Sequence, residues 1–282
     1  MEQHKFSASK FFDLADFEHA KLFKEEEPVW TALTRLAEYF HSFFKKNWPL
    51  KGVTGLVLEP LVIVNGELML EGSISMSVNP HGEVEVRVDG RHIADAALIM
   101  PGAYLFDDRV IIGPGTVVEP GALIKGPTVI GKNCEVRQGA YFRGNALIGD
   151  ECLVGHATEV KNSIMLNGAK AGHFAYLGDS ILGARVNLGA GTKLANLKMV
   201  SGPVTIRTQE GEIYETGLRK LGAVLGDGCE TGCNTVTSPG TLVGKGSMVL
   251  PCVSLPGGYY PPRLIVSHHK DTLRVHEKPR GS

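Results

Sequence analysis

Large apolar residues recur at every sixth position beyond residue 100. Ten consecutive positions keep this spacing: Ile112, Val118, Ile124, Ile130, Val136, Phe142, Ile148, Val154, Val160 and Leu166. A small residue follows four positions after each of the first eight, from Thr116 to Thr158. Such hexads are typical of a parallel β-helix, in which three short strands form one triangular coil. Residues 18 apart then stack at about the 4.8 Å spacing of neighbouring strands. The pattern predicts this fold over 100–256.

The six-residue period breaks twice. After Leu166 the apolar positions return out of phase at Leu182, which predicts an insertion near 167–176. A second break covers about 198–221, where residues alternate around Glu210-Gly211 as in a β-hairpin, before the hexads return. A break in an otherwise strict repeat is where we expect a functional site.

The first fifty residues differ from the rest in pattern and composition. They hold eight of the eleven phenylalanines, both tryptophans and none of the 35 glycines. Apolar residues from Val29 to Phe43 recur at spacings of three and four, which predicts a helix beginning near Pro28. A second helix is expected over 11–23. The aromatic stripe is expected to be core or a docking surface for another protein.

Two further segments complete the predicted organisation. Apolar residues alternate with period two between Leu56 and Val88, and two turns separate them, Asn65-Gly66 and Asn79-Pro80-His81-Gly82, so residues 51–99 are expected to form a small cap of short strands. We therefore predict a mainly β chain with a helical segment at 1–50, this cap, the β-helix at 100–256 and a polar tail at 257–282.

Charge and cysteine content exclude several classes of function. The net charge of −1 and isoelectric point near 6.8 give no basic surface for nucleic acid or an anionic membrane. There is no apolar run of about 20 residues and no apolar export signal, so a cytoplasmic protein with reduced thiols is expected. Cys134 and Cys152, 18 apart, should stack inside the coils, and Cys229 and Cys233 lack a second pair for zinc.

Two histidines, His156 and His173, fall within the predicted β-helix. His173 lies in the first break, within KAGHFAYLGD, and is the stronger functional candidate. A histidine side chain has an ordinary pKa near 6.5 and can accept a proton at neutral pH, as the attack of an amine on a thioester requires.

Several motifs together resemble a known enzyme family. QGAYFRGNA, HATEVKNS, KAGHFAYLGDS and VNLGAGT resemble the acetyltransferase domain of the bifunctional enzyme that makes UDP-N-acetylglucosamine. TGLRKLGAVLGDGCETGCN resembles the C-terminal domain of archaeal sugar-1-phosphate nucleotidylyltransferases with amino-sugar-phosphate acetyltransferase activity. The resemblance implies a left-handed β-helix, a homotrimer with sites between subunits, acetyl-CoA as co-substrate and no metal in the transfer step.

The resemblance also assigns roles to individual residues. It places the catalytic histidine at His173. Its substrate-binding positions are Arg143, Lys161, Tyr176 and Asn187, and its positions near acetyl-CoA are Asn196 and Cys233. Arg143 and Lys161 are 18 apart, so they should lie on adjacent coils and can hold one phosphate together.

The chain also departs from the family, and other functions compete with acetyl transfer to an amino-sugar 1-phosphate. Residues 1–99 lack a glycine-rich nucleotide loop, Leu197 replaces an aromatic residue, a lysine is missing near Gly202, and Cys233 replaces a serine. One alternative is a non-catalytic partner whose N-terminal helices dock on a separate nucleotidylyltransferase; another is acyl transfer to a nucleotide amino sugar. A metal hydrase would need a third histidine near His156 and His173.

Overall fold

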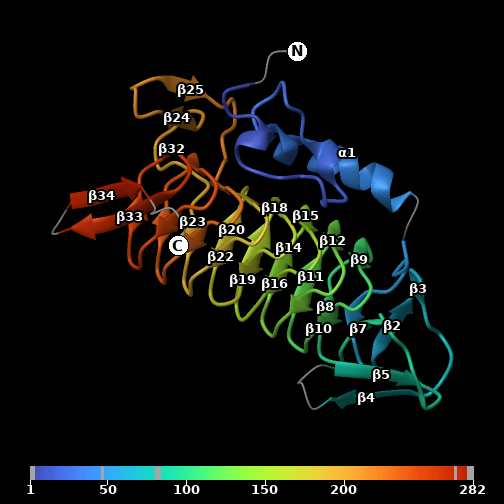
Figure 1. Cartoon of the computed structure of the whole chain (residues 1–282). Helices are drawn as coiled ribbons and strands as arrows, with labels where there is room; N and C mark the ends of the chain where they lie inside the picture. The colour runs from blue at the N-terminus through green and yellow to red at the C-terminus, as the bar shows by residue number, and fades with distance from the viewer. Residues whose placement is uncertain (1–3, 46–47, 80–83, 270–271, 278–282) are drawn as a thin grey trace.

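The computed structural model describes residues 4–45, 48–79, 84–269 and 272–277. Its central feature is a parallel β-helix with three faces, each a sheet whose strands come from successive coils (Figure 1). The predicted mainly β class and the β-helix itself are confirmed. The chain passes from face 1 to face 2 to face 3 and back to face 1.

Face 1 consists of the strands β3 Glu67–Leu68, β2 Leu61–Val64, β7 Ala97–Ile99, β10 Val117–Val118, β13 Glu135–Val136, β16 Leu153–Val154, β19 Lys170–Ala171, β22 Asn187–Leu188, β27 Glu230–Thr231, β30 Met248–Val249, β33 Leu264–His269 and β34 Thr272–Glu277. Face 2 consists of β1 Gly55–Leu56, β8 Tyr104–Leu105, β11 Leu123–Lys125, β14 Tyr141–Arg143, β17 Glu159–Lys161, β20 Tyr176–Gly178, β23 Lys193–Leu194, β28 Val236–Thr237 and β31 Ser254–Leu255. Face 3 consists of β9 Val110–Ile112, β12 Thr128–Ile130, β15 Ala146–Ile148, β18 Ser163–Met165, β21 Ile181–Leu182, β26 Ala223–Leu225, β29 Thr241–Val243 and β32 Gly258–Tyr260.

The hexad positions line the interior of the prism, with one exception. From Ile112 to Val160 they are buried and belong to one core cluster. The next interior position is Met165, which pairs with Ile148, whereas Leu166 packs outside the prism. Cys134 and Cys152 stack inside as predicted, and the Cys152 amide donates to Cys134 Sγ at 3.4 Å.

The expected insertion near 167–176 is absent. Ile148 pairs with Met165 and Met165 with Leu182, which are 17 residues apart in each case rather than 18. One residue is missing where face 2 turns into face 3, at Asn162, and again one coil later at Asp179. The phase of the repeat therefore shifts by deletion, and the coils stay regular.

The second break is a projecting hairpin, as predicted. β24 Thr205–Arg207 pairs antiparallel with β25 Ile213–Glu215. The coil resumes in register beyond it, because Leu182 pairs with Leu225. Figure 1 shows this hairpin beside the N-terminal segment and away from the axis of the prism.

The N-terminal segment covers the outside of face 3. The predicted first helix is present as α1 Thr31–Phe44, but the predicted second helix is wrong: 11–23 holds only the short 3₁₀ turn Ala20–Leu22, and Ala8–Lys10 forms another. The hydrogen bonds within 11–23 are isolated turns, such as Ala20 N–H to the Phe17 carbonyl at 3.0 Å, and the segment also binds the β-helix, since the Phe11 carbonyl accepts from the Asp227 amide at 2.9 Å. The Asp13 amide likewise donates to the Asp227 carboxylate at 2.6 Å.

The aromatic stripe of this segment is core in this structure. Phe6, Phe11 and Phe40 are almost fully buried, and they share a cluster with outward-facing residues of face 3 such as Val129 and Leu147. Of the two expected roles, core and docking surface, the structure shows core, because these side chains pack on the chain's own β-helix.

Short strands close both ends of the prism. At the N-terminal end, β4 Ile74–Val78, β5 Val84–Val88 and β6 Arg91–His92 form the predicted cap, and the second expected turn falls partly outside the described residues. At the other end, the described residues of the expected polar tail form strands instead: β32 and β33 continue the faces and β34 folds back on β33. Leu264 and Val266 alternate and are buried, which explains the extra coil.

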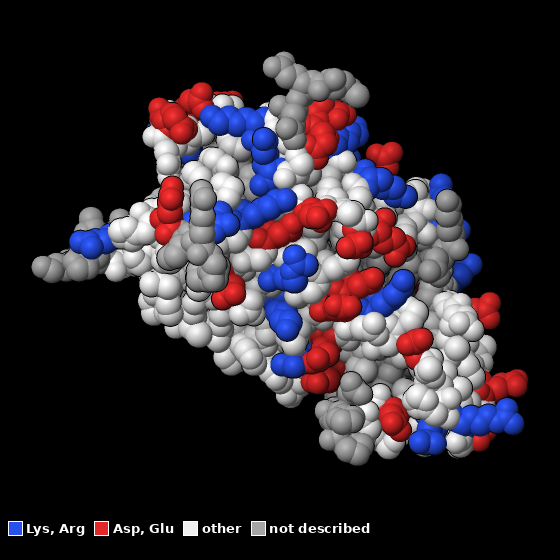
Figure 2. All heavy atoms as spheres, viewed as in Figure 1, with Lys and Arg blue, Asp and Glu red and all other residues white. Residues whose placement is uncertain are grey.

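None of the helices in the described part of the chain is long and apolar enough to cross a lipid bilayer. Charges of both signs alternate over the face seen in Figure 2, without a broad field of one sign.

Candidate active site

A buried carboxylate organises the polar residues where face 2 turns into face 3. Asp179 Oδ1 accepts from Asn162 Nδ2 at 2.7 Å, and Oδ2 accepts from Lys161 Nζ at 3.3 Å and from Asn196 Nδ2. The Tyr176 hydroxyl donates to Asn196 Oδ1 at 3.4 Å. We call these five residues the Asp179 cluster. Three of them, Lys161, Tyr176 and Asn196, are predicted site residues that the structure brings together.

A glycine makes room for this arrangement. Tyr176 and Gly178 point outward from the same strand, β20, and a Cβ at Gly178 would lie 2.5 Å from the Tyr176 hydroxyl and 2.7 Å from Asn196 Nδ2. Both contacts are closer than real Cβ atoms approach. The Tyr176 ring can therefore lean along the strand to reach Asn196 only because residue 178 has no side chain.

Arg143 lies one coil before Lys161, at the equivalent end of its strand. Its Nη1 donates to Glu159 Oε1 at 2.6 Å, and this bond raises the pKa of the exposed guanidinium. Burial raises the pKa of Tyr176, with Glu159 and Asp179 adding to the effect. The two predicted phosphate ligands thus stand on adjacent coils, each paired with its own carboxylate. A bound phosphate has to displace or share these carboxylates.

His173 lies at the other end of face 2, on the corner that follows face 1. Its ring stacks on His156, with centroids 5.6 Å apart and planes inclined by 18°. His173 is exposed and His156 is half-buried. His173 is part of a regular corner and not of an insertion, and β20 brings Tyr176 three residues after it.

Asn187 and Cys233 lie apart from the Asp179 cluster. Asn187 begins β22 on face 1, between Lys170 and Glu230 in the strand register. Cys233 is exposed on the corner between faces 1 and 2, in the column that contains His173. A single chain therefore does not gather all the predicted site residues into one pocket.

Sequence reasoning missed two parts of this region. Asp179, the hub of the cluster, lies within KAGHFAYLGDS but is not among the predicted site residues, because the repeat spacing does not show which corner residues are buried. The basic pair Arg219 and Lys220 returns from the hairpin insertion beside Leu197, with which Lys220 forms a β-bridge. Together with Asp179, this pair borders a cavity of about 260 Å³, whose lining residues are Leu33, Thr34, Asn162, Asp179, Leu218, Arg219 and Lys220.

In the described ranges, no three histidine, cysteine or carboxylate side chains are close enough together to hold a metal ion.

The chain is similar to several known proteins. A family model described as the GMPPB C-terminal domain matches residues 124–211. The bifunctional sugar-1-phosphate nucleotidylyltransferase/acetyltransferase of Sulfurisphaera tokodaii is 38% identical over 98 residues, which is 35% of this chain and 24% of that protein. The chain thus spans about a quarter of the length of this relative. Among solved structures, the polysialic acid O-acetyltransferase OatWY aligns with 60% of this chain and 84% of its own, at a TM-score of 0.37 and 14% identity.

A second relative matches over most of its length. The putative uncharacterized acetyltransferase YaiX of Escherichia coli K12 is 34% identical over 196 residues, which is 68% of this chain and 83% of that protein. This extent of identity, together with the parallel β-helix, shows that the chain belongs to the hexapeptide-repeat family of acyltransferases.

Proposed function

We propose that the protein transfers an acetyl group from acetyl-CoA to the amine of an amino-sugar 1-phosphate. The observation that carries the proposal is the Asp179 cluster, with Arg143 on the preceding coil. It presents two cations, a phenol and an amide along one corner of the prism, which suits a small ligand with a phosphate and several hydroxyls.

In this proposal His173 is the general base. The amine nitrogen attacks the thioester carbonyl carbon, and the C–N bond forms as the C–S bond breaks. The proton of the amine passes to the His173 imidazole and then to the departing sulfur, which leaves as the thiol of coenzyme A. His156 stacks against the base and has a positioning role only. Asn196 and Cys233 are the proposed contacts near acetyl-CoA.

A homotrimer is part of the proposal. Asn187 is on face 1 and Tyr176 is on face 2, so within one chain the two residues lie on different faces of the prism. A site between subunits would bring a face 1 residue of one chain to a face 2 residue of another. Light scattering should give about three times the chain mass of 30.3 kDa, and a monomer would contradict a site of this kind.

The decisive experiment combines a substrate screen with a histidine variant. Purified protein is incubated with acetyl-CoA and a panel of amino-sugar phosphates and nucleotide amino sugars, and released thiol is measured. With the active substrate, His173→Ala should lower kcat by about 10²- to 10⁴-fold with little change in KM.

His156→Ala is the matched control and should lose far less activity. Near-full turnover by His173→Ala would contradict the role of the base. Release of thiol only with nucleotide amino sugars would correct the substrate. No release with any acceptor, together with stable capture of a separate nucleotidylyltransferase, would replace the proposal by a non-catalytic role.

A further inference from the structure

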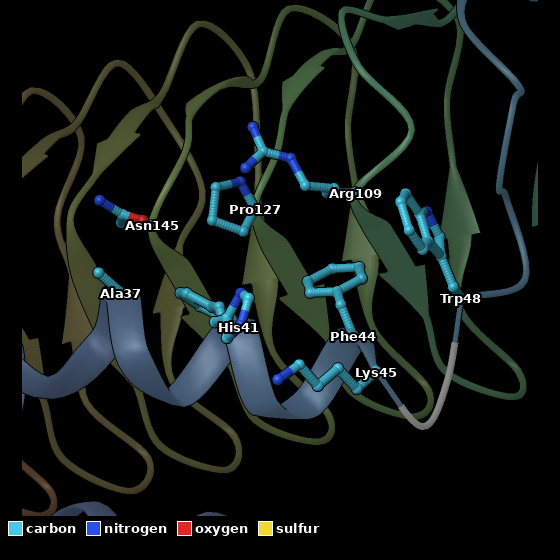
Figure 3. Close-up of a pocket in the computed structure, with 9 residues that line it drawn as sticks. Ala37, His41, Phe44, Lys45, Trp48, Arg109, Pro127 and Asn145 are labelled. Carbon is cyan, nitrogen blue, oxygen red and sulfur yellow. The ribbon is translucent and has the colours of Figure 1, made fainter.

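A large cavity lies between the C-terminal half of α1 and the corner of faces 2 and 3, on coils that precede those of the Asp179 cluster at the same corner (Figure 3). Its volume is about 570 Å³, within the range of sites that hold small organic molecules. Its lining residues are Ala37, Phe40, His41, Phe44, Lys45, Trp48, Arg109, Pro127 and Asn145.

One side of this cavity is apolar and well supported. Phe40 and Phe44 are buried in the cluster that joins α1 to face 3. Trp48 meets Phe44 edge to face, with ring centroids 6.3 Å apart. The Trp48 indole N–H donates to the Asp108 carbonyl at 2.8 Å, so the polar atom of the ring is already satisfied. What the ring offers a ligand is its carbon surface.

The other side is basic. His41 and Lys45 extend from α1 and Arg109 extends from the β-helix, and Figure 3 shows the Arg109 side chain above Pro127. None of the nine lining residues is acidic. The nearby carboxylate of Asp107 accepts from the backbone amides of Arg109 at 3.1 Å and Gly126 at 3.0 Å, and it meets Arg109 Nε at 3.4 Å.

A second cavity under the N-terminal segment has a lining of the opposite charge. This cavity has a volume of about 420 Å³, and its lining includes five carboxylates: Asp13, Asp16, Asp150, Glu151 and Asp227. The same segment therefore covers one acidic cavity and one basic cavity, although the chain as a whole is almost neutral.

We propose that the basic cavity binds a small organic anion that combines an apolar body with one phosphate or carboxylate group. The apolar body packs on Phe40, Phe44 and Trp48, and the anionic group meets Arg109 and Lys45. Two sources share this chemistry: a nucleotide, whose base is the apolar body, and an alkyl amphiphile. The site shares no lining residue with the Asp179 cluster, and the proposal does not depend on the proposed acetyl transfer.

Trp48 can report binding directly, because the chain has only two tryptophans. In Trp30→Phe, fluorescence comes from Trp48 alone, and calorimetry on the wild-type chain gives a second measure. The probes are adenosine 5′-monophosphate, dodecyl phosphate, adenosine and inorganic phosphate. At least one of the first two should bind with a Kd below 1 mM and at least tenfold more tightly than adenosine and phosphate.

Variants then locate the site. Arg109→Gln and Lys45→Gln should each weaken binding of the anionic probe about tenfold, the effect of losing one charge-assisted contact. Arg91→Gln, an exposed cation on β6, is the matched control and should not change it. Ala37→Phe should block the cavity while leaving the melting temperature close to the wild-type value.

Several results would overturn the proposal. They are no binding of either organic phosphate below 1 mM, equal binding of inorganic phosphate, and unchanged binding in Ala37→Phe, which would place the ligand elsewhere. Binding of the nucleotide alone or of dodecyl phosphate alone would support the proposal and identify the source.

Discussion

The strongest test of the Asp179 cluster is to remove its charge and keep its shape. Asp179 is 6% exposed and adopts a positive φ of 48°. Asparagine also tolerates this backbone conformation, so Asp179→Asn changes chemistry without adding strain. Its carbonyl oxygen can still accept from Asn162. Its NH₂ group then faces two donors, Asn196 Nδ2 and Lys161 Nζ.

The expected cost follows from these two lost contacts. A hydrogen bond to a charged group contributes about 1.5–3 kcal/mol. Lys161 has 26% of its side chain exposed and regains water, whereas Asn196 is buried and does not. We therefore expect Asp179→Asn to lower the free energy of unfolding by about 2–4 kcal/mol, and to lower Tm by about 3–7 °C for a chain of this size.

Urea unfolding followed by circular dichroism, at one fixed protein concentration, measures this effect. Asp95→Asn is the matched control, because Asp95 has a similar positive φ of 57° but is exposed. The control should stay within about 0.5 kcal/mol of wild type. An equally small change in Asp179→Asn would refute the view that this carboxylate holds the corner together.

Three further predictions follow from particular side chains. Gly178→Ala should reduce turnover at least about tenfold, because the added methyl group displaces the Tyr176 hydroxyl. Its Tm should shift by less than about 5 °C, because the methyl group does not disturb the core. Wild-type kinetics would contradict this prediction. Arg143→Ala and Lys161→Ala should each weaken sugar-phosphate binding by about 1–3 kcal/mol, and equal affinities in calorimetry would place the phosphate elsewhere. Burial lowers the pKa of His19, so on acidification this side chain is protonated in the unfolded chain before it is protonated in the folded one, and the free energy of unfolding should fall as pH drops below about 6.5. In urea unfolding at pH 7.5 and 5.5, His19→Gln should reduce the difference in stability between the two pH values. An unchanged difference would exclude His19 as its source.

The repeat was readable from the sequence because each inward position has to be apolar, whatever else the coil does. The repeat predicts the wrong inward residue where two apolar residues are adjacent in the sequence. In SIML, Met165 and Leu166 are both large and buried, and the hexad period selects Leu166 although Met165 points inward. A deleted corner residue and an inserted segment shift the period in similar ways, so the pattern could not separate them.

The outward-facing residues of the face 3 strands indicate where the N-terminal segment packs. Ile111, Val129, Leu147 and Ile164 point outward from face 3 and are buried against that segment. Apolar residues on both sides of a strand indicate that both sides are covered. This signal would have predicted that the aromatic stripe packs on the chain's own β-helix.

The candidate site was partly predictable for the same geometric reason. A spacing of 18 residues places Arg143 and Lys161 on neighbouring coils of one face, whereas Tyr176 was identified only through the family resemblance. Arg219 and Lys220 could not be placed in this way, because the hairpin insertion separates them from the coil they rejoin. Asp179 depends on burial at a corner, which the spacing alone does not show.

The N-terminal segment, which contacts face 3 along most of its length, changes how this solenoid should come apart. In a simple coil stack each coil touches only its neighbours, so the ends can fray and unfolding can proceed one repeat at a time. Here one segment joins β9 at one end to β32 near the other through a shared cluster that includes Ile111 and Tyr259. Loss of any coil along this span also releases contacts made by distant coils. We therefore expect the prism and the N-terminal segment to form a single cooperative unit, in which local opening is costly and unfolding occurs in one transition.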